Sequence, residues 1–106
     1  MAFEIEIFKG LQKDFDLMIP ETFSKEIILE QLKLKISEML QGNAEIFFQT
    51  LYRLDISEQK TNAALLDNEH AIDCLAQLIY ERQLQKAISR VENKPKEMPD
   101  DVDLKW

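Results

Sequence analysis

His70 and Cys74 have the most chemically versatile side chains in this sequence. They lie four positions apart, so a helix would place them on one face, where they could bind zinc or act as base and nucleophile. Zinc needs three or four protein ligands, however, and the sequence has no second histidine or cysteine. Neighbouring turns of one exposed helix also offer no cleft and no third catalytic group. We therefore predict no metal site, no cofactor and no catalytic residue.

A basic ridge runs along the end of the longest predicted helix, with bases at intervals of four: Arg82, Lys86, Arg90 and Lys94. At about 100° per residue, these bases continue the side of the helix that Ile79 is expected to bury, with Lys86 near its middle. Burying a cation without a partner is costly, so the ridge needs an explanation. Three remain open: solvated last turns whose cations suit a helix C-terminus, neutralisation by the acids of residues 97–103, or contact with an acidic protein or nucleic acid.

A second charged cluster marks a predicted corner between two helices. Asp55 and Glu58 have the spacing of a capping box, and Ser57 is an alternative cap. Because acids at a helix start satisfy free backbone amides, this cluster predicts a structural role. Arg53 and Asp55 are expected to form an inter-helix ion pair with Glu81 or Arg82. Acid–base catalysis would instead need a concave, partly dry pocket, which the sequence does not indicate.

The composition predicts one globular domain built from helices. The chain has 106 residues, 45% hydrophobic and 31% charged, and only two glycines and three prolines interrupt it. So few turn residues disfavour a β sandwich or barrel. We expect residues 1–91 to form a single helical domain and residues 92–106 to form a charged, proline-containing tail.

Charge and hydropathy narrow the expected surroundings of the protein. A net charge of −7 repels free nucleic acid over most of the surface. The single cysteine excludes an intrachain disulfide, and the first residues carry acids where a signal peptide carries bases. No apolar run approaches the roughly 20 residues that span a bilayer. We expect a cytoplasmic protein with no membrane partner.

Apolar residues at helical spacing predict an all-α fold, a four- or five-helix antiparallel bundle with an extended C-terminal tail. Residues 3–19 are ambiguous: helix is favoured, and a β-hairpin turning near Gly10 is the alternative, because residues 3–7 alternate. The hairpin would place like charges opposite each other, which is destabilising. The remaining predicted helices cover residues 24–42, 44–54, 55–66 and 69–91.

Helix ends are predicted from capping residues. Ser24 and Asn43 are expected to cap the second and third helices, and Asp67 or Asn68 the last. Gly42 is expected to close the second helix in a left-handed conformation.

The predicted second helix is apolar on two sides. Ile27 and Leu34, seven residues apart, lie opposite its main apolar stripe. Such a helix is either central in its bundle or shared with a second subunit. Trp106, at the end of the tail, is a further candidate anchor in a groove of the same or a neighbouring subunit.

These features predict a small non-catalytic helical protein that acts by protein–protein contact as a homodimer. The candidate partner-binding residues are Ile27, Leu34, Arg82, Lys86, Arg90 and Trp106. The alternative is a nucleic-acid-associated or transcription-linked regulator that uses the basic ridge at residues 82–94.

Overall fold

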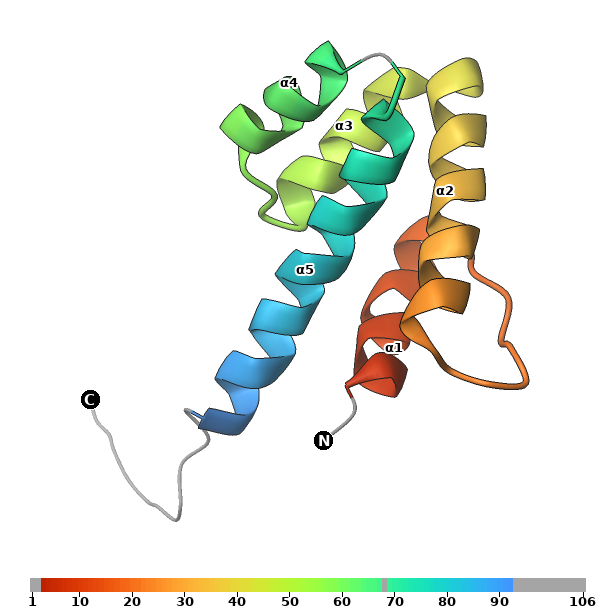
Figure 1. The fold of residues 1–106 in the computed structure, drawn as a ribbon, viewed down its shortest axis with the longest axis vertical. Coiled ribbons are helices and arrows are strands. Elements are labelled where there is room, and N and C mark those ends of the chain that lie inside the picture. The colour runs from red at the N-terminus through yellow and green to blue at the C-terminus, as the bar shows by residue number, and fades with distance from the viewer. Residues whose placement is uncertain (1–2, 68, 93–106) are drawn as a thin grey trace.

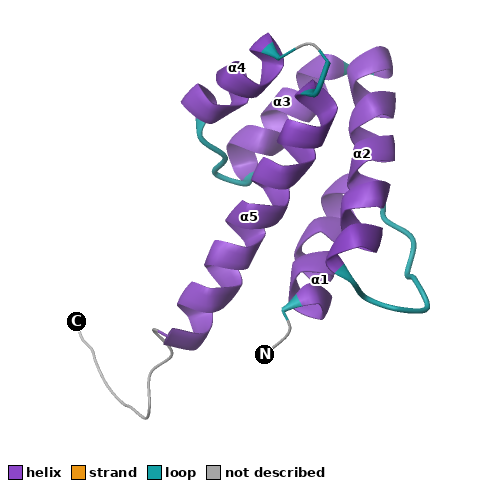
Figure 2. Cartoon of the chain, viewed as in Figure 1, coloured by secondary structure: helices purple, strands orange, loops and turns teal. Residues whose placement is uncertain are grey.

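Five helices make up the regular structure of the residues that the structure describes. A computed structural model describes residues 3–67 and 69–92, and no strand occurs in these ranges (Figures 1 and 2). The helices are α1 (Glu4–Phe15), α2 (Lys25–Gly42), α3 (Ala44–Arg53), α4 (Glu58–Leu66) and α5 (Ala71–Glu92). The all-α bundle predicted from the sequence is confirmed, and residues 4–15 take the helical alternative. Glu92, predicted to start the tail, is the last residue of α5, and residues 93–106, Trp106 among them, lie outside the described residues.

α1 is a helix because its apolar residues bury one face. Ile7, Phe8, Leu11 and Phe15 are buried, and a strand would have divided them between two faces. The helix ends earlier than expected, because Asp16 is left-handed (φ 53°) and the Leu17 amide donates back to the Gln12 carbonyl over 3.2 Å.

The segment after α1 differs from the prediction. Met18 and Ile19, which the helical alternative for residues 3–19 included, lie beyond the helix and are exposed. The backbone of Met18 is instead clamped to α2 by the Gln31 side chain, which accepts from its amide at 2.8 Å and donates to its carbonyl at 2.9 Å. The chain therefore leaves α1 as a loop fastened to α2.

α2 begins as predicted and ends differently. The Ser24 hydroxyl accepts from the Ile27 amide at 3.2 Å, which confirms the cap. The prediction of a left-handed Gly42 is wrong, because neither glycine has positive φ. Gly42 belongs to α2, and Asn43 starts α3 immediately by accepting from the Ile46 amide, so no left-handed closure intervenes.

α5 organises the core by packing against α1, α2 and α4. Its buried face runs through Leu75, Ala76 and Ile79 and continues to Tyr80, Gln83 and Ala87. α1 approaches α5 closely at Gly10, where a Cβ atom would come within 2.8 Å of Gln83 Oε1. No helix in the described part of the chain is long and apolar enough to cross a membrane.

Candidate partner-binding surface

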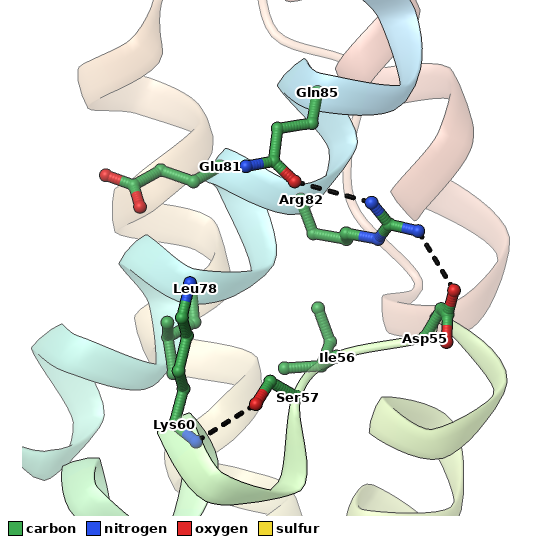
Figure 3. A pocket seen from close by; sticks show the side chains of 8 residues that line it. All are labelled: Asp55, Ile56, Ser57, Lys60, Leu78, Glu81, Arg82 and Gln85. Atoms are coloured by element: carbon green, nitrogen blue, oxygen red, sulfur yellow. Dashed lines mark hydrogen bonds and ion pairs between the residues drawn. The ribbon is translucent and has the colours of Figure 1, made fainter. Parts of the chain in front are cut away.

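Two bases of the ridge, Arg82 and Lys86, make contacts within the chain, and Figure 3 shows those of Arg82. Arg82 Nη2 donates to the Asp55 carboxylate at 2.9 Å, and Nη1 donates to Gln85 Oε1 at 3.3 Å. Lys86 Nζ donates to the Leu54 carbonyl at 3.0 Å. Contrary to the prediction, Lys86 does not lie in the middle of the buried face, because that face runs towards Gln83 and Ala87.

Arg90, the last base of the ridge that the structure describes, takes no part in these contacts. Arg90 is exposed near the end of α5, as expected for a solvated last turn. Lys94 and the tail acids lie outside the described residues. Among the described residues, the ridge thus combines one solvated cation, Arg90, with two cations, Arg82 and Lys86, that bind the loop between α3 and α4.

The charged corner is a structural junction. Asp55 is left-handed (φ 66°), and the Ile56 amide donates to the Leu51 carbonyl at 3.0 Å, which closes α3. The expected ion pair between Asp55 and Arg82 forms. Ser57 is the residue that caps α4, because its hydroxyl accepts from the Lys60 amide at 3.2 Å.

A small hollow of about 180 Å³ lies at this corner. Its lining residues are Asp55, Ile56, Ser57, Lys60, Leu78, Glu81, Arg82 and Gln85 (Figure 3). Glu58 does not line it. The Asp55 side chain is 78% exposed and already paired with Arg82, so this carboxylate lacks the dry setting that acid–base catalysis requires.

Arg53 pairs with α1 and not with α5. Its Nη1 atom donates to the Asp14 carboxylate at 3.0 Å, while most of the Arg53 side chain stays in solvent. The expectation that Arg53 joins Glu81 or Arg82 is therefore wrong. Asp14, which the sequence analysis did not single out, is the nearer partner because the ends of α1 and α3 meet.

His70 and Cys74 have different surroundings. His70 is exposed beside Asp67, with Nδ1 3.4 Å from the carboxylate, and its backbone carbonyl accepts from the Cys74 amide. Cys74 is half-buried and packs against the core. Across residues 3–67 and 69–92, no three His, Cys, Asp or Glu side chains gather closely enough to hold a metal ion.

α3 carries apolar residues on two opposite faces. Its inner face consists of Phe47, Thr50, Leu51 and the following Leu54, all buried. Its outer face consists of Glu45, Phe48, Gln49, Tyr52 and Arg53, which together line a shallow hollow. The two sets start two residues apart, so at about 100° per residue they point in nearly opposite directions.

The outer face exposes two aromatic rings. Tyr52 is 86% exposed and Phe48 is 38% exposed. Both rings also line a groove of about 370 Å³ between α3 and α4. The other residues of this groove are Leu51, Ile56, Glu58, Thr61, Asn62 and Leu65. The aromatic pair thus joins the groove and the outer face into one surface that is mainly apolar.

The residues predicted on α2 contribute less. Ile27 is half-buried, and Leu34 is 63% exposed between Lys33 and Lys35. Ile27 and Leu34 belong to α2, whereas Arg82 and Lys86 belong to α5 and bind the loop between α3 and α4. Phe48 and Tyr52 were not predicted as a pair, although the spacing of residues 45, 48, 49, 52 and 53 marks a second helical stripe.

Comparisons with known proteins give this surface no precedent, since no family model, no curated protein and no solved structure matches the chain.

Proposed function

We propose that this protein acts by protein–protein contact and that its partner is a second copy of itself. The observation that carries the proposal is the outer face of α3, where Tyr52 and Phe48 stand in solvent on one side of a helix whose other side is buried. Aromatic residues are enriched in protein interfaces and supply much of their binding energy. Two adjacent exposed rings therefore favour a contact surface.

The size of this surface sets the expected strength of the dimer. α3 has ten residues and is about 15 Å long, so its outer face is small for an obligate interface. Contacts below about 1,200 Å² of total buried area are typically weak or transient. We expect a reversible homodimer with a micromolar dissociation constant and a folded monomer.

Leu34 gives weaker support for dimerisation. It stands alone between Lys33 and Lys35, so apposing this side of α2 in two copies would bring like charges together. Lys33 pairs with Asp73 at 3.4 Å and Lys35 with Glu38 at 3.9 Å, which only partly offsets that repulsion. Leu34 therefore serves better as a control position.

The test is sedimentation velocity over a micromolar to millimolar concentration range. The native protein is expected to shift from monomer to dimer. Changing Phe48 and Tyr52 together to serine is expected to abolish the shift, whereas Leu34→Ser leaves it intact. Helical circular dichroism checks that each variant is folded. A native protein that stays monomeric throughout the range would contradict the proposal.

No specific observation favours the nucleic-acid alternative, because Arg82 and Lys86 already bind Asp55 and the Leu54 carbonyl. We also propose a cytoplasmic location, supported by a free thiol at Cys74 and by the acidic character of the chain. Cell fractionation tests the location.

A further inference from the structure

We propose that the α3 helices of two copies pair antiparallel about a two-fold axis, and that the two Gln49 side chains meet on this axis. This inference rests on the proposed homodimer and specifies its register. It follows from three properties of the outer face of α3: opposite charges at its two ends, a self-complementary side chain at its centre, and exposed apolar residues spaced evenly about that centre.

The charges select the direction of pairing. Glu45 and Arg53 stand at opposite ends of the outer face, eight residues or about 12 Å apart. In an antiparallel pair, Glu45 of each copy meets Arg53 of the second copy. In a parallel pair, Glu45 would meet Glu45 and Arg53 would meet Arg53. Since like charges across an interface are unfavourable, the antiparallel direction is favoured.

The centre of the face is chemically suited to a symmetry axis. Gln49 lies midway between Glu45 and Arg53, is exposed, and lines the same hollow. An amide side chain both donates and accepts, so two Gln49 side chains that meet on a two-fold axis can bind each other reciprocally. A residue with a single charge at this position would repel its own copy.

The same register pairs the exposed apolar residues. Tyr52 and Ile46 are equally distant from Gln49, so each Tyr52 faces Ile46 of the second copy. Ile46 is half exposed, and no buried role in the monomer accounts for it. Phe48 lies about 100° around the helix from Gln49, on the same side as Tyr52, and so borders the contact. The proposed register thus covers Ile46 and Tyr52 and places Phe48 at the edge of the same contact.

The existing contacts of Arg53 are compatible with this arrangement. Arg53 Nη1 donates to Asp14 at 3.0 Å and Nη2 donates to Thr50 Oγ1 at 3.4 Å, yet 62% of the Arg53 side chain is exposed. A guanidinium group has five N–H donors, so those that these two contacts leave over can donate to a carboxylate of the second copy.

Charge reversal tests the register. Glu45→Arg and Arg53→Glu each place like charges at both ends of the interface, and each is expected to raise the dimer dissociation constant about tenfold. The combined variant restores opposite charges and is expected to return to within about threefold of the native value. Asp14→Asn controls for the lost contact with α1 and is expected to leave dimerisation unchanged.

The outcomes separate this inference from the proposed function. If the native protein dimerises but the single reversals have no effect, or the combined variant stays as weak as they are, the register is wrong while the dimer stands. If the native protein never dimerises, both proposals fail.

Crosslinking gives a second, independent readout. In a Cys74→Ala background, Gln49→Cys is expected to form an interchain disulfide rapidly with oxidised glutathione, because the axis brings the two position-49 residues within bonding distance. Glu45→Cys is expected to crosslink slowly with itself, since antiparallel pairing separates the two copies of that residue. Faster crosslinking at position 45 than at 49 would overturn the register.

Discussion

Arg82 of α5 donates a 2.9 Å hydrogen bond to the carboxylate of Asp55, the left-handed residue that closes α3. One turn further along α5, Lys86 donates to the carbonyl of Leu54 at 3.0 Å. Two successive turns of α5 therefore hold two successive residues of the loop between α3 and α4. This junction sets where α3 ends, and so where its outer face points.

Substitutions at Asp55 separate its charge from its backbone conformation. Asp55→Asn keeps a residue type that tolerates left-handed φ, so we expect a loss of only about 0.5 kcal/mol from the exposed ion pair. Asp55→Ala is expected to cost about 1–2 kcal/mol more, because alanine lacks the short polar side chain whose local hydrogen bonds let Asp and Asn adopt the left-handed region. Asp55→Gly should be more stable than Asp55→Ala, since glycine adopts this region freely.

Urea denaturation of the three Asp55 variants measures these differences. If alanine and glycine proved equally stable at position 55, the left-handed closure of α3 would be contradicted.

The two bases of the ridge on either side of Ala87 are expected to differ. Lys86→Met removes a donor to the Leu54 carbonyl and should lower the free energy of unfolding by about 1 kcal/mol. Arg90 is exposed about one helical turn further on, so Arg90→Met should change the free energy of unfolding by less than about 0.5 kcal/mol. Thermal and urea unfolding of both variants provide the comparison. Equal losses would show that the Lys86 contact adds no stability.

Truncating a side chain on the inner face of α3 is expected to cost much more stability than truncating one on the outer face. Leu51 is 3% exposed, so Leu51→Ala should destabilise the monomer by about 2–4 kcal/mol through lost packing and a cavity. Tyr52→Ala truncates a larger side chain, but one that is exposed, so it should lower the free energy of unfolding of the dilute monomer by less than about 0.5 kcal/mol. Unfolding curves at low concentration test this, and a large loss for Tyr52→Ala would mean that the ring packs within one copy.

Tyr80 predicts a loss of stability at alkaline pH. Burial of its phenol raises its pKa above the ordinary value of 10.0, and the carboxylates of Glu4 and Glu26 add to the effect. In the unfolded chain the phenol ionises near pH 10, whereas in the folded protein it stays neutral to higher pH. The folded state therefore loses stability as pH rises from about 10 to the folded pKa.

The comparison of native protein with Tyr80→Phe isolates this contribution, since phenylalanine keeps the ring and removes the ionisable group. Between pH 8 and a pH above 10, the denaturation midpoint should fall further for the native protein than for Tyr80→Phe. Parallel declines in both proteins would assign the alkaline loss to other groups.

The helices were predictable because their signals are local. The spacing of Ile28, Leu32 and Ile36 and the caps at Ser24 and Asn43 depend only on residues within a few positions, and the structure confirms them. The left-handed turns were not predicted, because they occur at Asp16 and Asp55 while glycine is the usual residue there. Gly42 was misassigned because α3 follows α2 without a connecting turn.

The candidate surface was only partly predictable, because it depends on which neighbours a helix acquires. Sequence spacing showed apolar residues on two sides of α2, but in the structure that property belongs more fully to α3, whose outer side is left uncovered. The Asp55–Arg82 pair was expected, but the contact of Lys86 with the Leu54 carbonyl depends on how α5 crosses the loop at residues 54–55. Long-range packing of this kind leaves no local pattern.

The close approach of Gly10 to Gln83 has a consequence for folding during synthesis. Chains emerge from the ribosome N-terminus first, and domains generally fold as units. α1 precedes α5 in the chain, so its contacts with α2 can form before those with α5. The part of α1 that lies against Gln83 therefore stays uncovered until α5 has been translated.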